Sequence, residues 1–275
     1  MAVHLGQHLM SLTDQLRVEP ATRRVRAWCD GTPVLDTEDA MLVWEPRRVV
    51  PMYAVPETDL LVPITPVPTV EHPADLPPIL GPVNFGWHLH DGQSYSLSVA
   101  GTDLPGVAFA PADPDLGGRL VVEWAPFEWV EEDQPVTGHP HDPFKRIDLL
   151  AAHRRIQVSV DGTLLADTTR GVALHETHIP VRWYLPREDV RLDLLEPSPT
   201  TSTCAYKGQA SYLSLRGGTA ATEDVAWTYL DPLPEVAAIR GLVCFYAERT
   251  DLVIDGAAVP RPWTPWSSPQ EAERF

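Results

Sequence analysis

The chain has 275 residues, of which 44% are hydrophobic, and a formal net charge of -17. This length and composition are typical of a folded globular protein with one large domain or two ordinary ones. Because the negative charge repels polyanions, we expect neither nucleic-acid binding nor adsorption to anionic membranes.

The sequence also limits the compartment and the cofactors that we expect. No apolar run reaches the roughly 18–20 residues that span a bilayer, and no secretory signal is visible. The three cysteines, Cys29, Cys204 and Cys244, are widely spaced. They suggest neither a disulfide framework nor a paired zinc motif. We therefore expect a cytoplasmic protein with reduced thiols and no cofactor.

The first predicted domain covers residues 1–135. Apolar residues recur at helical spacing near its start, at Leu5, Leu9, Leu12 and Leu16. This spacing predicts a helix over residues 4–17. A β-rich body is expected over residues 25–130. Within that body, the proline-rich residues 62–82 predict an extended surface loop.

The second predicted domain covers residues 140–256. Residues that suit the first turn of a helix stand near its start, at Asp142 and Pro143. They predict a helix over residues 142–155. A β-rich body is expected over residues 156–255. The tail, residues 257–275, is rich in proline and tryptophan, and we expect it to pack back on a domain or to contact a partner.

The second body shows strand and turn signals. Residues 156–160 alternate between apolar and polar before the Asp161-Gly162 turn, which predicts a hairpin. Residues 181–185 alternate again, and residues 212–215 end at a glycine turn. The continuous apolar run 242–246 predicts a buried central strand. The fold class is therefore mainly β, with two tandem small domains that are β-barrel-like or made of folded sheets, each preceded by one helix.

The two bodies resemble each other along their length. Identical residues recur at constant spacing in 25–57 and 156–188, including Asp30/Asp161, Gly31/Gly162, Asp36/Asp167, Thr37/Thr168, Glu45/Glu176 and Tyr53/Tyr184. The match resumes with Gly92-Gln93 over Gly208-Gln209. The common order predicts one domain used twice in tandem. The first repeat has lost most of the polar and aromatic residues that the second repeat keeps.

Four segments of the second repeat carry a family resemblance, namely 174–177 (LHET), 183–190 (WYLPREDV), 204–212 (CAYKGQASY) and 224–229 (DVAWTY). With these motifs the second repeat resembles the domain-of-unknown-function 427 family, and the first repeat looks like a diverged member. Ala205 departs from the family pattern, which usually has proline. The resemblance implies a compact, mostly β bacterial domain that is sometimes labelled nucleotidyltransferase-like.

The residues themselves do not suggest nucleotidyl transfer. That reaction needs close carboxylates that hold a divalent metal beside the triphosphate. Glu223 and Asp224 are adjacent, so on a strand they would face opposite ways. No phosphate-binding glycine loop is present. Nucleotidyl transfer is therefore only a lesser alternative.

The candidate ligand site lies in the second repeat. The chain has only two lysines, Lys145 and Lys207. Lys207 either binds an anionic ligand, acts as a base or nucleophile if burial lowers its pKa, or is a solvated turn residue. Arg187 either clamps a carboxylate or phosphate or holds its own loop in a salt bridge. Glu176 has a structural hydrogen-bonding role or a catalytic one.

Aromatic residues surround these groups in the sequence. Either they line a ligand pocket or they pack in the core: Tyr184, Tyr206, Tyr212, Trp227 and Tyr229. Cys204 is a nucleophile or, more simply, a small buried residue. No metal is expected, and His88 and His90 of the first repeat are only weak candidates for metal ligands.

Two classes of function remain open. The leading hypothesis is a small molecule, which can be an anion, bound in a polar and aromatic pocket of the second repeat, with catalysis open. The alternative is a non-catalytic protein-interaction module, which the acidic composition and the tail favour. The two differ in whether Lys207, Arg187 and the tyrosines converge on one cavity.

Overall fold

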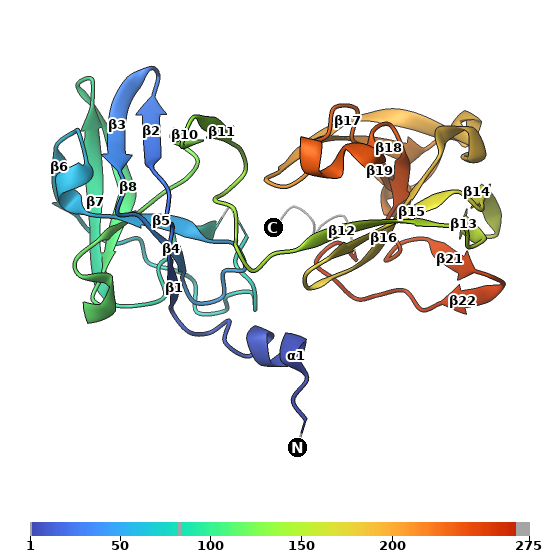
Figure 1. Cartoon of the computed structure of the whole chain (residues 1–275), viewed down its shortest axis with the longest axis horizontal. Helices are drawn as coiled ribbons and strands as arrows, with labels where there is room; N and C mark the ends of the chain where they lie inside the picture. The colour runs from blue at the N-terminus through green and yellow to red at the C-terminus, as the bar shows by residue number, and fades with distance from the viewer. Residues whose placement is uncertain (1, 82–83, 268–275) are drawn as a thin grey trace. The chain divides into compact units, whose positions relative to one another are not determined.

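The computed structural model describes residues 2–81 and 84–267. The chain divides into unit 1, Met1–Asp142, and unit 2, Pro143–Phe275. Both units consist mainly of antiparallel strands (Figure 1), so the predicted mainly β class is confirmed. No helix among the described residues is long and apolar enough to cross a membrane.

Unit 1 begins with α1 (Leu5–Met10) and contains two antiparallel sheets. The larger sheet has the order β1 (Arg17–Pro20), β4 (Met41–Trp44), β5 (Met52–Val55), β9 (Leu120–Val122), β8 (Thr102–Pro111), β7 (Gly92–Val99) and β6 (Ile64–Val67). The smaller sheet has the order β11 (Gln134–Val136), β10 (Glu128–Glu131), β2 (Val25–Cys29) and β3 (Thr32–Thr37). The 3₁₀ helices of this unit include η1 (Glu57–Asp59) and η3 (Pro114–Leu116). The main core combines apolar side chains from both sheets.

Unit 2 also contains two antiparallel sheets. The larger has the order β12 (Ile147–Ala152), β15 (Gly171–Glu176), β16 (Ile179–Leu185), β20 (Val243–Phe245), β19 (Ala226–Thr228), β18 (Gly208–Leu215) and β17 (Leu195–Cys204). The smaller has the order β14 (Thr163–Thr168), β13 (Ile156–Val160), β21 (Asp251–Ile254) and β22 (Ala257–Val259). The 3₁₀ helices are η4 (Arg187–Asp189), η5 (Leu192–Leu194), η6 (Ala220–Thr222) and η7 (Pro234–Ile239).

The larger sheet of unit 2 has an apolar cluster on each face. The inner cluster lies between the two sheets and includes Val158 and Leu185, with Trp183 packed against it. The outer cluster lies on the opposite face and includes Tyr184 and Trp227. Because side chains alternate along a strand, neighbouring residues of β16 serve different clusters.

The two units share their topology. When the strands of each unit are numbered in chain order, the strand order is the same in both sheets. Local contacts also correspond, because the Thr37 hydroxyl donates to Asp59 Oδ2 at 2.6 Å and the Thr168 hydroxyl donates to Asp189 Oδ2 at 2.6 Å. The same strand order and the same turn contact are therefore built twice.

The predicted match of Tyr53 with Tyr184 is wrong by one residue. Tyr53 packs in the core between the sheets of unit 1, whereas Tyr184 lies in the outer cluster of unit 2. The residue of unit 2 that faces its inner core is Trp183. A shift of one residue turns a strand side chain to the opposite face of the sheet. The shared residue type of Tyr53 and Tyr184 therefore does not mean that they occupy equivalent positions.

The predicted helix over residues 142–155 is wrong, because Ile147–Ala152 form strand β12. This strand pairs with β15 along its whole length. Ile147 and Leu149 alternate in the sequence and pack against the outer cluster, while Leu150 is exposed. Pairing with the sheet edge outweighs the helix-starting signals before it, which act only locally.

Three other boundaries also differ from the sequence prediction. The first helix covers only Leu5–Met10 instead of residues 4–17, and none of its residues is buried. Within residues 62–82 the chain forms β6, although residue 82 lies outside the described residues. Strand β22 takes up the first residues of the predicted tail 257–275, of which 268–275 lie outside the described part.

The strands predicted in the second body are largely confirmed. Asp161 and Gly162 have φ of 48° and 78° and join β13 to β14 in the predicted hairpin. The run 242–246 supplies β20, which is fully buried between β16 and β19. Among the described residues, however, no sheet closes into a barrel, so the barrel-like form of the prediction is wrong. The sheets remain open, and each unit pairs a large sheet with a small one.

Candidate functional site

The only two lysines of the chain meet at one carboxylate in unit 2. Lys207 Nζ lies 2.6 Å from Glu176 Oε2, and Lys145 Nζ lies 3.0 Å from Glu176 Oε1. The exposed fraction is 4% for the Glu176 side chain, 10% for Lys207 and 20% for Lys145. Among the ion pairs of the described residues, two cations therefore share one anion, which leaves one positive charge in excess at a largely buried position.

Three separate segments bring this lysine pair together. Glu176 ends β15, beside a register shift in the pairing of β15 with β16. Lys207 lies in the turn between β17 and β18, and the following Gly208 has φ of 89°, which favours glycine. Lys145 comes just before β12, whose Ile147 pairs with Glu176. The pairing of edge strand β12 with β15 thus places Lys145 next to Glu176.

The ion pair between Lys207 and Glu176 holds both groups in their charged forms. Burial alone would lower the pKa of the Lys207 ammonium, but the Cys204 sulfur and the Glu176 carboxylate raise it overall. Burial alone would raise the pKa of Glu176, but Lys207 and Lys145 lower it overall. Lys207 is therefore a permanent hydrogen-bond donor. Its surroundings do not supply the lowered pKa that the base or nucleophile hypothesis requires.

The predicted aromatic residues divide into two groups. Tyr184, Trp227 and Tyr229 are buried in the outer cluster, where Trp227 Nε1 donates to the Tyr184 hydroxyl at 3.1 Å. Burial raises the pKa of the Tyr184 and Tyr229 hydroxyls, so both stay neutral. Tyr206 is only partly buried, and its ring centroid lies 5.6 Å from Lys145 Nζ. Of these four residues, Tyr206 is the one whose ring lies over a lysine of the pair.

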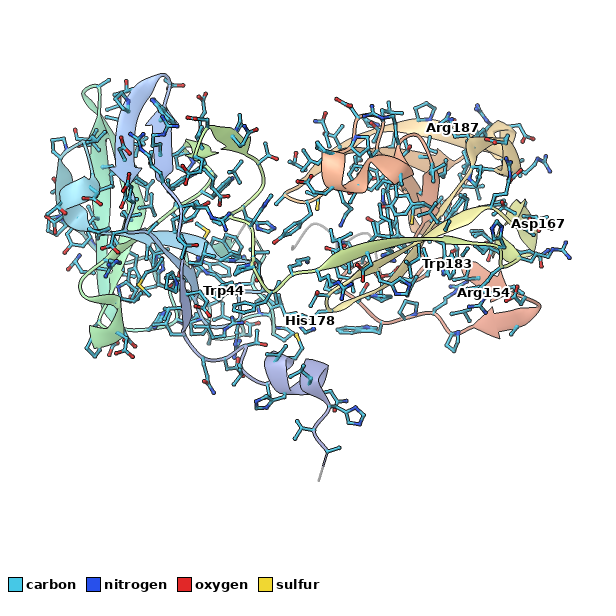
Figure 2. All side chains as sticks on the ribbon, in the orientation of Figure 1. Trp44, Arg154, Asp167, His178, Trp183 and Arg187 are labelled. Carbon is cyan, nitrogen blue, oxygen red and sulfur yellow. The ribbon has the colours of Figure 1, made fainter. Side chains whose placement is uncertain are left out.

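Tyr212 is partly buried and packs against the outer cluster, whereas Arg187 is exposed. The Tyr212 hydroxyl lies 2.8 Å from the Ser202 hydroxyl, across the pair formed by β17 and β18. Arg187 is exposed in η4 at the surface of unit 2 (Figure 2). Among the described residues, no ion pair or hydrogen bond joins Arg187 to Glu176. The structure therefore brings Lys207 and Glu176 together and does not bring Arg187 to them.

A different arginine holds the loop of Arg187. Arg170 makes hydrogen bonds of 3.0 Å to both Asp189 oxygens, and it lies 3.1 Å from Glu188 Oε1. The internal salt bridge that the sequence suggested for this loop exists, but Arg170 makes it in place of Arg187. Arg187 thus has neither the structural role nor the position of a second cation beside Lys207.

Sequence reasoning missed Lys145 as a site residue. The rarity of lysine in this chain could have indicated it, because that rarity applies to Lys145 as much as to Lys207. The predicted helix over residues 142–155 separated Lys145 from the β-rich body. Once these residues are placed in an edge strand, Lys145 lies next to Glu176.

A second buried cation of unit 2 is fully neutralised. Arg182 makes two hydrogen bonds to Glu248, at 2.6 and 2.7 Å. Its guanidinium lies 5.6 Å from the ring centroid of Trp266, and Thr264 donates to Glu248 at 2.6 Å. The tail therefore packs back on unit 2 through Thr264 and Trp266. This neutral cluster offers no excess charge to a ligand.

Unit 1 has no lysine at the carboxylate that matches Glu176 in the sequence. Glu45 Oε2 lies 2.8 Å from Arg48 Nη2, and Glu45 Oε1 lies 2.9 Å from His88 Nδ1 and 3.5 Å from His90 Nε2. Burial alone would raise the pKa of Glu45, but Arg48 and the two histidines lower it to about 2. The weak metal candidates His88 and His90 thus converge on a carboxylate.

No metal-binding group is evident in the part of the chain that the structure describes. Within residues 2–81 and 84–267, no three His, Cys, Asp or Glu side chains are grouped in a way that could hold a metal ion.

Comparison with protein families gives a match to part of unit 2. A family model described as "Domain of unknown function (DUF427)" matches residues 148–256, which lie within unit 2. No curated protein matches the chain. The predicted resemblance is therefore confirmed for this part of the second repeat. The resemblance of the first repeat to the same family stays a prediction.

Proposed function

We propose that unit 2 binds a small anionic molecule at Lys145 and Lys207. The observation that carries this proposal is the excess positive charge created where both lysines meet Glu176. The protein as a whole carries a net charge of -17, so an anion gains nothing from long-range attraction and depends on local cations. A pair of lysines on one carboxylate supplies such a local field.

Lys145 is the residue that we expect to contact the ligand directly. It keeps a fifth of its side-chain surface exposed, whereas Lys207 is almost covered and is bound tightly to Glu176. An ammonium group has three donors, and Glu176 uses one of those on Lys145. The partly buried ring of Tyr206 gives a ligand a flat surface beside Lys145. Lys207 then acts by fixing Glu176 and adding charge.

We further propose that the two units are copies of one domain and that only the second keeps this anion site. The common strand order and the matched threonine–aspartate contacts support duplication. In unit 1 the place of the lysine pair is taken by an arginine and two histidines packed on Glu45. Unit 1 serves as a scaffold in this proposal.

Fewer observations support the two alternative functions, a protein-interaction module and nucleotidyl transfer. A protein-interaction module is favoured by Trp263, whose surface is 80% exposed in the tail. Nucleotidyl transfer is suggested only by the label sometimes given to the family, and no residue geometry described above favours it. Catalysis at the lysine pair stays open, because the charged ammonium groups can bind an anion with or without a subsequent reaction.

The test compares anion binding by the full chain and by two matched variants. Inorganic phosphate and citrate serve as probes, and affinity is measured by calorimetric titration. In Lys145→Ala we expect a loss of affinity of about 1.5–3 kcal/mol, the usual value of a hydrogen bond to a charged group. Arg146→Ala is the control, because it removes the same charge from an adjacent side chain that is 79% exposed.

The outcome is decisive because both variants change the net charge equally. Equal weakening in Lys145→Ala and Arg146→Ala would mean that the probes sense only the overall field, and the proposed site would then be wrong. Unchanged binding in Lys145→Ala would have the same consequence. Circular dichroism spectra of both variants establish that each is folded.

A further inference from the structure

A hollow opens between the two sheets of unit 2, on the face of β16 opposite the lysine pair. Its outer part has a volume of about 310 Å³ and is lined mainly by apolar side chains, among them Trp183, Ala247 and Val259. A second, inner pocket of about 10 Å³ shares Val181, Trp183, Ala247 and Leu252 with it and is also lined by Val158 and Phe245. The outer volume lies at the lower end of the roughly 300–1,000 Å³ typical of small-molecule sites.

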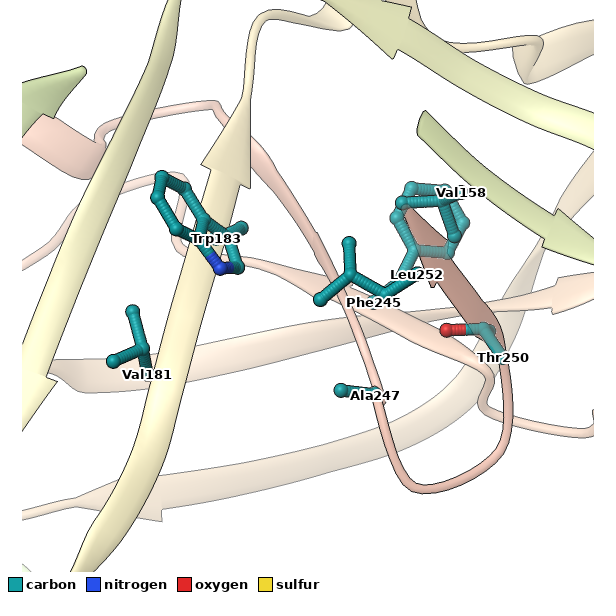
Figure 3. A pocket seen from close by; sticks show the side chains of 7 residues that line it. All are labelled: Val158, Val181, Trp183, Phe245, Ala247, Thr250 and Leu252. Atoms are coloured by element: carbon teal, nitrogen blue, oxygen red, sulfur yellow. The ribbon is translucent and has the colours of Figure 1, made fainter. Parts of the chain in front are cut away.

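Small side chains create this hollow. In Figure 3, Trp183 and Val181 stand on one side, and Thr250 and Leu252 stand on the other. Ala247 lies between them in this view and lines the pocket together with Trp183. Trp183 packs against the inner cluster and is only partly buried.

In unit 1 the same space is filled by aromatic rings. Trp124 and Trp129 stack with ring centroids 5.1 Å apart and planes inclined by 10°. Phe127 meets Trp129 edge-on at 6.1 Å, and Tyr53 lies 5.1 Å from Trp129. Phe127 and Trp129 belong to the buried core between the two sheets of unit 1. Stacked aromatic rings thus occupy this position when the chain supplies them.

Strand register shows that the two positions are equivalent. Trp129 of β10 pairs with Ala27 of β2, as Leu252 of β21 pairs with Val158 of β13. The strands that precede them also match, through the hydrogen bonds from Glu123 N to Val107 O at 2.8 Å and from Tyr246 N to Val225 O at 3.0 Å.

Three aromatic residues are therefore replaced by smaller ones in unit 2. In both units the loop between these strands has the same length. The replacements, in chain order, are Trp124 by Ala247, Phe127 by Thr250 and Trp129 by Leu252. All three replacements line the inner pocket, and Ala247 and Leu252 also line the outer one. Part of the aromatic volume of unit 1 is therefore missing in unit 2, where Phe245 takes the position of Val122.

Arg154, at the rim of the hollow, is a cation with hydrogen-bond donors that are not used by the described residues. Arg154 lines the outer part, and its Nε donates to Asp255 Oδ2 at 2.7 Å. In the described residues, its terminal nitrogens make no hydrogen bond, and 55% of the side chain is exposed. The matching Arg23 of unit 1 instead pairs with Glu131 at 2.6 Å, at the position that Ile254 takes in unit 2.

We propose that the hollow of unit 2 binds a planar aromatic carboxylate, with its ring on Trp183 and its carboxylate on Arg154. The ring would occupy the outer part of the hollow beside Ala247, the counterpart of Trp124 in unit 1. Offset or tilted aromatic contacts favour such a ring beyond simple burial of apolar surface. A guanidinium binds a carboxylate through two parallel hydrogen bonds, which sets the orientation of the ligand. This site is independent of the anion site proposed at Lys145.

The test uses indole-3-acetate as the probe and neutral indole as its uncharged counterpart, titrated into the full chain by calorimetry. The parent should bind indole-3-acetate more tightly than indole. Ala247→Trp restores the ring of unit 1 and should weaken the binding of both probes at least tenfold. Arg154→Ala should weaken indole-3-acetate about tenfold or more and leave indole unchanged.

Arg155→Ala is the matched control, because Arg155 is a neighbouring arginine with a similar exposed fraction of 59% and its own partner, Asp167. This variant should bind both probes like the parent. If Ala247→Trp does not fold, the two arginine variants still decide the question. The proposal is overturned if the parent binds neither probe at millimolar concentration. It is also overturned if a folded Ala247→Trp binds like the parent or if both arginine variants behave alike. Binding seen only in Trp263→Ala would show that the chain's own exposed indole fills the hollow, and would overturn it too.

Discussion

Replacing Lys207 by alanine should destabilise unit 2 far more than replacing Lys145. Lys207 and Glu176 form a buried pair at 2.6 Å with side chains 10% and 4% exposed. Removing one partner of a buried pair costs about 3–5 kcal/mol when the other charge is left uncompensated. Because Lys145 still lies 3.0 Å from Glu176, we expect the lower end of that range, about 3 kcal/mol. Lys145 lies farther from Glu176 and is partly exposed, so we expect Lys145→Ala to cost about 1.5 kcal/mol, the low end for a charged hydrogen bond.

Urea denaturation of the full chain measures these differences in the free energy of unfolding. Glu176→Gln, alone and combined with Lys207→Ala, completes a double-mutant cycle for this pair. We expect a coupling energy of about 0.5–3 kcal/mol between the two sites. If Lys207→Ala and Lys145→Ala cost the same, or if the double variant is merely additive, then Glu176 is not the charge that the lysines hold. The reasoning about this site would then be refuted.

Three further outcomes follow from the same contacts. Glu176 has a lowered pKa, so its share of stability is present above its usual value near 4.5 and is lost as the pH falls through its folded pKa. Lys207 has a raised pKa, so its share is present below 10.5 and is lost as the pH rises through its folded pKa. Urea midpoints measured across both windows should fall at the two ends, and a midpoint unchanged below pH 4 would contradict this. Arg187→Ala should bind phosphate with the same affinity as the parent, as measured by calorimetry. A loss of affinity as large as that in Lys145→Ala would show that Arg187 belongs to the anion site. Trp266→Ala removes a ring lying over the buried Arg182 and should lower the melting temperature, roughly 4 °C for each kcal/mol lost in a domain of this size, whereas an unchanged melting temperature would mean that the tail contact is not stabilising.

Short sequence patterns predicted the β structure correctly where the conformational preferences or the burial of a few adjacent residues determine it. The Asp161-Gly162 hairpin follows from two residues that accept positive φ, and β20 follows from a continuous apolar run. The helix over residues 142–155 failed because its start signals act within one turn. Whether Ile147–Ala152 joins the edge of a sheet depends on β15, which is distant in the sequence.

The candidate site was predicted in part for the same reason. Lys207, Glu176 and the family motifs could be recognised in the sequence. The contact between Lys207 and Glu176, however, depends on the turn before β18 lying next to the end of β15. Lys145 reaches Glu176 only through the pairing of β12. Equating Tyr53 with Tyr184 concealed Trp183, because a shift of one residue changes the face on which a side chain lies.

The most direct test of the anion site uses the rarity of lysine. Because the chain has only Lys145 and Lys207, protein labelled with ¹⁵N in the lysine side chains gives two ammonium signals, and the Lys145→Ala variant assigns them. We predict that titration with inorganic phosphate shifts the Lys145 signal saturably, with a smaller shift of Lys207 through their common partner Glu176. Two signals that stay unchanged at phosphate concentrations that raise the melting temperature would place the anion elsewhere and contradict the account.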